Sequence, residues 1–278
     1  MTGNKTFLIT GISSGLGRAF AEGVLAAGHT VVGTVRRAEA AAAFEALSPG
    51  RAHACVLDVT DFDAIPEAVA GIEREVGPVD VLVNNAGYGH EGVLEESLLE
   101  ELWRQFDANV FGAVAMTKAV LPGMRTRRSG HIVNVTSMGG FITLPGITYY
   151  CGSKFALEGI SEALVKEVRH LGIRVTALAP GQFRTDWAGR SMSRTPRSIP
   201  DYDAVMDPIR SARQAKNGNQ PGDPARAAQA LLTLVAAEQP PVHLYLGEDA
   251  LQLVADKMTA LQAEITAWEE VSRSTSYR

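Results

Sequence analysis

Tyr150, Lys154 and Ser137 are the residues whose types and spacing best suit acid–base chemistry. A phenol has a pKa of about 10, so a tyrosine transfers protons at neutral pH only when its anion is stabilised. In a helix, Lys154 would lie one turn after Tyr150, and its charge would lower the pKa of the phenol. Ser137 could hold a carbonyl or alcohol oxygen against that phenol, because a hydroxyl both donates and accepts hydrogen bonds. These three residues therefore suit the proton transfer that accompanies transfer of a hydride.

A tyrosine and a lysine at this spacing also occur by chance on amphipathic helices, so the elements around them matter. Seven short apolar runs (residues 6–10, 30–35, 52–57, 79–83, 130–135, 173–179 and 242–246) alternate with helical patterns at 18–27, 39–47, 65–76, 100–124, 150–171 and 224–237. Continuous Val, Ile and Leu runs between helices indicate parallel strands that are buried on both faces. We therefore predict an α/β fold, a single-domain Rossmann-like doubly wound parallel sheet of about seven strands with helices on both faces.

A glycine-rich turn follows the first apolar run. Residues 11–17 have the sequence Gly-Ile-Ser-Ser-Gly-Leu-Gly and lead into a predicted helix. Glycines let the backbone turn sharply and approach a pyrophosphate, which the amides at the start of the helix can bind. A turn without a ligand is the alternative, but its place between a strand and a helix favours a nucleotide.

Composition excludes several classes of protein. The 278 residues carry a net charge of -5 without a basic patch, so we expect no nucleic-acid partner. No apolar run approaches the roughly 20 residues needed to cross a bilayer, and the amino terminus is too short for a signal peptide. The two cysteines, Cys55 and Cys151, suit a reducing cytoplasm. The six histidines lack metal-ligand spacing, so we expect no metal.

Together these features resemble the classical short-chain dehydrogenase/reductase family, over residues 5–250. The motifs that carry the resemblance are Thr-Gly-x-x-x-Gly-x-Gly at 10–17, Asp58, Asn84-Asn85-Ala86-Gly87, Asn109, Ser137, Tyr150 with Lys154, and Pro180-Gly181 with Thr185. The chain also looks similar to the branch related to 17β-hydroxysteroid dehydrogenases, through residues 141–146 and its extended carboxyl terminus.

The resemblance implies a role for each of these residues. Tyr150 would be the catalytic acid/base, Ser137 would orient the substrate oxygen, and Asn109 would distort its helix and hold a proton-relay water. Lys154 would lower the pKa of Tyr150 and bind the nicotinamide ribose. Asp58 would accept the adenine amino group, residues 85–87 would line the adenosine and Thr185 would contact the nicotinamide amide. The implied cofactor-binding residues are Gly11, Ser13, Ser14, Gly15, Leu16, Gly17, Arg36, Arg37, Asp58, Val59, Asn85, Ala86, Gly87, Tyr150, Lys154, Pro180, Gly181 and Thr185.

The end of the second predicted strand indicates which dinucleotide binds. NAD-binding members of the family carry an acid where this chain has Val35, and Arg36 and Arg37 follow. An acid would repel a 2′-phosphate, whereas an arginine binds phosphate oxygens with two hydrogen bonds. We therefore predict NADP(H) as the cofactor, with two solvated arginines as the alternative.

The function predicted is an NADP(H)-dependent oxidoreductase that interconverts a ketone or aldehyde and an alcohol. An extended-type epimerase or dehydratase is the alternative enzyme, but the glycine spacing at residues 11–17 disfavours it. A redox sensor that binds NADP without catalysis would be expected to lack Tyr150 or Lys154, and both are present.

Residues 182–223 break the alternation and are predicted to form a mobile substrate lid. The segment holds Arg184, Arg190, Arg194, Arg197, Arg210 and Arg213, and Pro196, Pro200, Pro208 and Pro221 are expected to interrupt regular structure. We interpret the arginines as solvated loop charges, in preference to an anionic substrate. His90, Glu91 and Glu95 are likewise interpreted as solvated loop residues, although they could border the pocket.

A helical extension is predicted over residues 248–278, with apolar residues at intervals of three and four. It could pack on its own core or on a partner subunit. Members of the family commonly pair through the helices that correspond to 100–124 and 150–171, so a homodimer or homotetramer is expected. The prediction is thus one domain, 1–278, with its core at 5–250.

Overall fold

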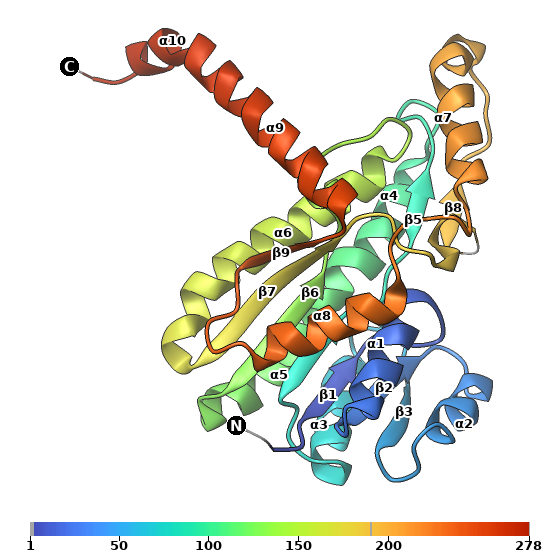
Figure 1. Ribbon diagram of the computed structural model, residues 1–278, viewed down its shortest axis with the longest axis vertical. Helices are drawn as coiled ribbons and strands as arrows, with labels where there is room; N and C mark the ends of the chain where they lie inside the picture. Colours follow the sequence, from blue (N-terminus) through green and yellow to red (C-terminus); the bar gives the residue numbers. More distant parts are fainter. Residues whose placement is uncertain (1–2, 190, 278) are drawn as a thin grey trace.

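A central parallel sheet organises the protein, whose computed structural model describes residues 3–189 and 191–277. Within these residues the sheet has the strand order β3-β2-β1-β4-β6-β7-β9 (Figure 1). Its strands are β1 (Thr6–Ile9), β2 (Thr30–Val35), β3 (Ala52–Val56), β4 (Val81–Asn84), β6 (Gly130–Val135), β7 (Ile173–Pro180) and β9 (His243–Leu246). The predicted seven-stranded, doubly wound α/β sheet is confirmed.

Helices cover both faces of this sheet, which is why its strands have continuous apolar sequences. On one face α1 (Gly15–Ala26), α2 (Glu39–Glu45) and α8 (Pro224–Ala236) pack on the side chains of Phe7 and Ile9. On the other face α3 (Ile65–Glu75), α5 (Gly112–Arg127) and the end of α6 (Thr148–Val168) pack on Leu8. Because successive residues of β1 point to opposite faces, all three side chains are buried.

The strand order places a switch point beside β1. From β1 the chain builds β2 and β3 on one side, and then crosses to β4 and β6 on the other. The loops that leave β1 and β4 therefore diverge at the carboxyl edge of the sheet, and ligands bind at such a crevice in this kind of fold.

The helix expected over residues 100–124 consists of three segments. They are α4 (Leu99–Phe106), a π-helical turn at Asp107–Phe111, and α5. A π-helical turn has a wider backbone than an α-helix and displaces the following residues by one position. Asn109 lies in this turn, so its side chain is presented differently from that of a regular helical residue.

Regular structure also occurs within residues 182–223. Strand β8 (Met192–Arg194) pairs with β5 (Gly89–Glu91), and α7 (Asp203–Ala215) follows. The expectation that Pro208 interrupts regular structure is wrong, because α7 continues through it. A proline removes one backbone hydrogen bond, and α7 is held from outside by burial of Met206 and by ion pairs to Glu91 of β5 and Glu96 of the following loop.

The last two helices lead away from the sheet. α9 (Glu248–Ala267) and α10 (Glu269–Ser274) project from the body of the molecule (Figure 1). Residues 255–277 are all exposed. Across the described residues, neither these helices nor any other has both the length and the hydropathy to cross a membrane.

One buried histidine makes the stability of this fold depend on pH. His131 of β6 is 4% exposed, and its Nε2 lies 3.1 Å from Thr176 Oγ1 on β7. The Thr176 hydroxyl donates to Pro241 O, so the imidazole Nε2–H donates to Thr176. His131 Nδ1 is buried and finds no hydrogen-bond partner among the described residues. Burial lowers the pKa of His131 to about 4, because a second proton would add an unsatisfied charge.

We expect acid to destabilise the fold through this histidine. Between pH 6.5 and 4 the unfolded chain binds a proton at His131 and the folded chain does not, so stability falls as the pH falls. Over that window the loss is about 3 kcal/mol, at about 1.4 kcal/mol per pKa unit. His131→Gln cannot titrate, and should lose about 2–3 kcal/mol less than wild type between pH 7 and 4.5 in urea unfolding. His170→Gln, at an exposed position, is the control and should match wild type. Equal acid sensitivity of His131→Gln and wild type would contradict the assignment.

Candidate active site

The glycine turn between β1 and α1 leaves its backbone open to a ligand. Gly11 and Gly15 have φ angles of +73° and +61°, a conformation that other residues rarely adopt. A Cβ atom at Gly17 would lie 2.3 Å from Asn85 Nδ2 and 2.4 Å from Gly11 O. A side chain is therefore excluded at Gly17, and the first amides of α1, which no side chain caps, remain available to an anion.

Hydrogen bonds join this turn to the loop after β4. The amides of Asn85 and Ala86 both donate to Thr10 Oγ1 at 2.9 Å, and Asn85 Nδ2 donates to Thr10 O at 2.9 Å. The structure thus brings residues 11–17 and 85–87 together, at the switch point of the sheet. Asn84 is directed into the protein, where its Nδ2 donates to Asn134 Oδ1 at 2.8 Å.

Asn109 is fixed by the backbone of the loop after β4. Its Oδ1 accepts from the Tyr88 amide at 3.0 Å, and its Nδ2 lies 3.1 Å from both Tyr88 O and Ser153 Oγ. The side chain is 1% exposed, and a Cβ at Gly87 would lie only 2.7 Å from Asn109 Oδ1. Asn109 therefore ties the π-helical turn to both the loop and α6.

Ser137, Tyr150 and Lys154 come together where β6 ends and α6 begins. Tyr150 and Lys154 are buried on α6, and the Lys154 ammonium lies 5.8 Å from the centre of the Tyr150 ring. Lys154 Nζ donates to Val135 O at 2.8 Å. Ser137 begins a 3₁₀ turn in which its Oγ accepts from the Gly139 amide at 3.0 Å. The arrangement predicted from residue spacing is present.

Burial changes the pKa values of both ionisable residues. It raises the pKa of Tyr150 to about 12, against the opposing effect of a hydrogen bond with Ser137. It lowers the pKa of Lys154 to about 8, against the opposing charge of Glu158. The expectation that the pKa of Tyr150 is lowered is wrong for this arrangement, because the phenol is enclosed and the ammonium is directed toward Val135 O. At neutral pH both groups are protonated.

Glu158 is a residue of this region that sequence reasoning missed. It follows Lys154 by one helical turn, so Tyr150, Lys154 and Glu158 share one face of α6. Its Oε2 lies 2.9 Å from His243 Nδ1 on β9. The spacing of four residues could have identified the acid, but its partner on a distant strand could not be deduced.

Further predicted cofactor-binding residues follow the carboxyl ends of β2 and β3, beside the glycine turn. Arg36 and Arg37 are exposed just past β2, and neither forms an ion pair within the described part of the chain. Asp58 is exposed past β3, and its Oδ1 accepts from the Thr60 amide and hydroxyl. Val59 is buried against Gly112. These positions leave the two guanidinium groups free to bind an anion.

The remaining predicted cofactor-binding residues are Pro180, Gly181 and Thr185. They lie at or after the end of β7, which is on the other side of β1 from β2 and β3. Pro180 ends the strand, and the Gly181 amide donates to Leu246 O. Thr185 faces the turn, since a Cβ on Gly15 would lie 3.7 Å from Thr185 Cβ. The structure thus brings Gly181 and Thr185 to the same edge of the sheet as residues 11–17.

Trp187 lies over the candidate catalytic tyrosine and was not predicted. The centres of the Trp187 and Tyr150 rings are 5.0 Å apart, and Ile147 and Cys151 pack in the same cluster. Burial raises the pKa of the Cys151 thiol, so it is protonated and poorly nucleophilic at neutral pH. The sequence offered one indication of this contact, since a tryptophan follows Thr185, a predicted cofactor-binding residue, by only two positions.

The interpretation of His90 and Glu91 as solvated residues is wrong. Pairing of β5 with β8 buries this loop, so His90 is 1% and Glu91 5% exposed. His90 Nε2 lies 3.0 Å from Thr195 Oγ1, and the ring stacks on Tyr149. Glu95 is exposed, as predicted.

The interpretation of the arginines of residues 182–223 as solvated loop charges is wrong for Arg210 and Arg213, which are partly buried. Arg184, Arg194 and Arg197 are exposed, but each contacts another group of the protein. Arg213 lies 2.7 Å and Arg194 3.2 Å from Glu91 carboxylate oxygens. The other contacts are Arg210 with Glu96, Arg197 with Asp203 and Asp207, and Arg184 with Gln220 O. Arg190 lies outside the described residues. The sequence did not reveal these pairs because their acids lie mostly about 100 residues away.

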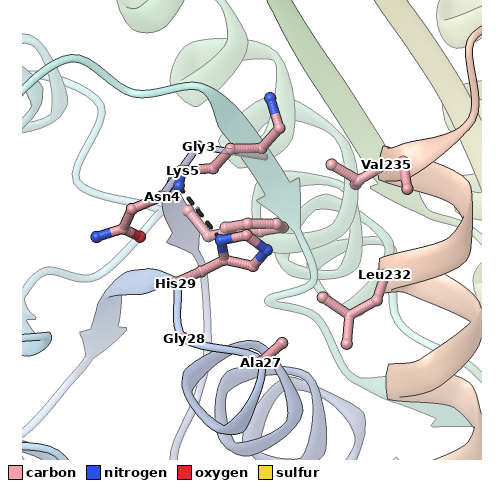
Figure 2. Close-up of a pocket in the computed structure, with 10 residues that line it drawn as sticks. Gly3, Asn4, Lys5, Ala27, Gly28, His29, Leu232 and Val235 are labelled. Atoms are coloured by element: carbon pink, nitrogen blue, oxygen red, sulfur yellow. Dashed lines mark hydrogen bonds between the residues drawn. The ribbon is translucent and has the colours of Figure 1, made fainter. Parts of the chain in front are cut away.

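Two cavities lie outside this constellation of residues. One of about 330 Å³ is at the amino end of β1, where the Lys5 amide donates to His29 Nδ1 (Figure 2). It is at the edge of the sheet opposite to Tyr150, so it is not part of the candidate site. The other, of about 540 Å³, lies between α7 and the turn before α6, and is lined by Val93, Leu94, Glu95, Pro145, Gly146, Thr148, Tyr202, Val205 and Met206. Among the described residues, no group of three His, Cys, Asp or Glu side chains could hold a metal.

Comparison with known proteins agrees with this geometry. The short chain dehydrogenase family matches residues 5–195. A solved short-chain dehydrogenase from Streptomyces avermitilis is 42% identical, with a TM-score of 0.93 over 99% of this chain and 100% of that one. A 3-ketodihydrosphingosine reductase from Bacteroides thetaiotaomicron is 38% identical over 246 residues, 87% of this chain and 88% of the relative. An NADPH-dependent 3-dehydrocapnine reductase from Ornithobacterium rhinotracheale is 35% identical over 206 residues, 72% of this chain and 73% of the relative.

The glycine turn at the switch point and the tyrosine–lysine pair at its edge thus occur in a chain that matches this family over most of its length. The protein belongs to the short-chain dehydrogenase family, whose members are oxidoreductases that act on alcohol or carbonyl groups with a nicotinamide cofactor.

Proposed function

We propose that the protein is an NADP(H)-dependent reductase that interconverts a ketone or aldehyde and an alcohol. The observation that carries the proposal is the cluster of Ser137, Tyr150 and Lys154 beside the glycine turn. Relatives described as reductases support reduction of a carbonyl group as the direction of the reaction, and one of them is described as NADPH-dependent. The direct test is oxidation of NADPH by the purified protein with a panel of ketones and aldehydes.

The residues present fit a dinucleotide, because a side chain at Gly17 has no room and the first amides of α1 have no side-chain cap. NADPH, when bound, supplies the hydride. Residues proposed to hold it are Gly11, Ser13, Ser14, Gly15, Leu16, Gly17, Arg36, Arg37, Asp58, Val59, Asn85, Ala86, Gly87, Tyr150, Lys154, Pro180, Gly181 and Thr185. Arg36 and Arg37 would meet a 2′-phosphate, since both are exposed and the buried Val35 offers no repelling carboxylate.

Tyr150 is in the protonation state that carbonyl reduction requires. With a pKa of about 12 the phenol is protonated at neutral pH and can donate to the oxygen of the substrate. Ser137 would hold that oxygen, and the buried Lys154 cation would limit the cost of the resulting phenolate. Asn109 would contribute by fixing the loop and α6 around them. Oxidation of an alcohol needs the deprotonated phenol and would be favoured only at alkaline pH.

We propose that residues 182–223 act as a substrate lid, although the segment is more ordered than its sequence implied. Glu91 anchors it through Arg194 and Arg213, and Trp187 brings it over Tyr150. The cavity between α7 and the turn before α6 has mainly apolar walls and would receive the apolar part of a substrate. The panel of carbonyl compounds should therefore include chains of increasing length. The resemblance to the 17β-hydroxysteroid dehydrogenase branch stays a prediction.

The remaining predictions concern organisation and location. We propose one domain over 1–278 and a homodimer or homotetramer formed through α4, α5 and α6, whose exposed apolar residues include Trp103, Phe155 and Ile160. A reducing cytoplasm is proposed because Cys55 and Cys151 are both free thiols.

Replacement of Tyr150 by Phe should remove the proton donor without changing the fold. We expect kcat for ketone reduction to fall at least about 10²–10⁴-fold, the contribution of a general acid, with NADPH affinity nearly unchanged. Tyr149→Phe is the matched control, since the Tyr149 hydroxyl donates to Ser97 O away from the cluster, and it should retain activity. A Tyr150→Phe enzyme within twofold of wild type would assign the acid to another group.

Replacement of Arg36 by Ala should weaken binding of NADPH but not of NADH. Loss of a charged hydrogen bond to phosphate costs roughly 1.5–3 kcal/mol, or about one to two decades of affinity. The double change Val35→Asp with Arg36→Val should reverse the preference. Fluorescence titration measures both affinities, and equal wild-type affinities for the two cofactors would refute the NADP(H) assignment.

Limited proteolysis should cleave within residues 182–223, and NADPH with substrate should slow that cleavage. Glu91→Gln removes the carboxylate shared by Arg194 and Arg213, so it should speed the cut, whereas Glu95→Gln at an exposed position should not. Mass spectrometry of the fragments locates the site. A cleavage rate in this segment that ligands leave unchanged would mean that the substrate pocket is preformed.

A further inference from the structure

The projecting helix α9 carries an apolar stripe that the described chain covers only at Val254. The exposed fractions along it are 57% for Leu251, 58% for Met258, 40% for Leu261, 55% for Ile265 and 65% for Trp268. Only its first turns touch the body, where Ala250 and Val254 pack with Met138 and Ile142. Beyond them the helix is exposed on all sides for about 20 Å, at 1.5 Å per residue.

The spacing of the stripe is that of a coiled-coil seam. Its residues are Leu251, Val254, Met258, Leu261, Ile265 and Trp268, with successive intervals of three and four residues. Leu251, Met258 and Ile265 occupy the first apolar position of each heptad, and Val254, Leu261 and Trp268 the second. A repeat of seven residues keeps one narrow face directed toward a second helix along its whole length.

The charge of the segment argues against a membrane surface as the occupant. The two helices carry six carboxylates, at Glu248, Asp249, Asp256, Glu264, Glu269 and Glu270, and two cations, Lys257 and Arg273. Helices that lie on anionic lipid have the opposite balance, with Lys and Arg on the polar face.

We propose that α9 pairs with α9 of a second copy of this chain, in antiparallel orientation, about a twofold axis between Thr259 and Ala260. In this register, each apolar layer brings a residue at the first apolar position of one helix against a residue at the second apolar position of the other helix. The exposed layers are Leu251 with Trp268 of the second copy and Met258 with Leu261, and each occurs twice. Ile265 of the second copy falls at the height of Val254, which already packs on the body. The stripe is therefore complementary to itself, as a twofold interface requires.

Flanking charges select the antiparallel orientation. Lys257 and Glu264 hold equivalent positions beside the seam, so antiparallel helices bring each lysine next to the glutamate of the other copy. Parallel helices would instead oppose Glu264 to Glu269 and leave Lys257 beside the uncharged Gln262. The unfavourable contact in the antiparallel pair is between Glu248 and Glu269. It occurs once at each end, where Glu269 is already paired with Arg273.

The body of the protein presents the helix for this contact. Asp249 accepts a hydrogen bond from the Gln182 amide at 2.8 Å, and Val254 anchors the second turn in the core. The far end of the second helix would reach Leu251 at the base of the first and cover the open edge of the small cluster around Val254. This contact is separate from the face of α4, α5 and α6 and does not depend on the proposed reaction.

Disulfide formation between two singly substituted full-length proteins tests the pair. Leu251→Cys and Trp268→Cys, each with Cys55→Ala, are mixed and mildly oxidised, and the linked peptides are identified by mass spectrometry. We expect a 251–268 disulfide, which can only join two chains. Asp256→Cys mixed with Ala263→Cys is the matched control, at the same height on the outer face, and should link at least tenfold less. Equal linkage in both mixtures overturns the proposal, and so does a 251–251 disulfide in Leu251→Cys alone, because it indicates parallel helices.

Charge exchange gives an independent test by sedimentation velocity. Lys257→Glu and Glu264→Lys should each weaken self-association of the full chain about tenfold, because both turn two attractive contacts into repulsive ones. An equimolar mixture should recover wild-type association. Both positions are exposed and remote from the body, so the melting temperature of the chain should stay unchanged. Association that neither substitution weakens, or that the mixture does not recover, overturns the antiparallel pair.

Discussion

The junction between Thr10 and Asn85 is the interaction on which the candidate site depends. Three hydrogen bonds of 2.9 Å join the end of β1 to the loop after β4, where neighbouring strands lead the chain in opposite directions. The junction leaves no space for a side chain at Gly17, so the backbone of the turn faces outward. It also fixes the loop that carries Tyr88, to which Asn109 is bonded. Cofactor turn, π-helical turn and α6 are thus positioned by one local contact.

Burial is the second constraint, and it sets the chemistry of the site. Removal from water raises the pKa of the Tyr150 phenol to about 12 and lowers that of the Lys154 ammonium to about 8, so two pKa values that are similar in water move apart. The enclosed phenol is protonated at neutral pH, so in the proposed reduction it would be the donor of the proton and not the acceptor. Glu158 opposes the shift of Lys154 from one turn further along α6, and His243 fixes that carboxylate. The acid–base character of α6 therefore depends on β9, at the far edge of the sheet.

Residues 182–223 are held by charge as well as by apolar burial. Glu91 is almost inaccessible, and it binds Arg194 and Arg213 of the proposed lid. Removal of one partner of a buried pair leaves an uncompensated charge, so such contacts are strong only while complete. A lid anchored by ion pairs can be ordered when it is closed over the site, and it can still move away from the site as one unit when these pairs break. By contrast, α9 carries its apolar residues outward, where only another surface can bury them.

The sequence by itself determined the sheet, the glycine turn and the Tyr150–Lys154 pair, because these depend on local periodicity and on spacing within one helix. It also indicated the heptad pattern of α9, since a stripe on one helix is a property of residues three and four apart. Only the tertiary structure decided the state of His90 and Glu91, because their partners Thr195, Arg194 and Arg213 lie far away in the chain and their burial depends on the pairing of β5 with β8. The pKa of Tyr150 was decided in the same way. One lysine in the sequence suggested a lower value, but desolvation by all the surrounding elements proved the larger effect.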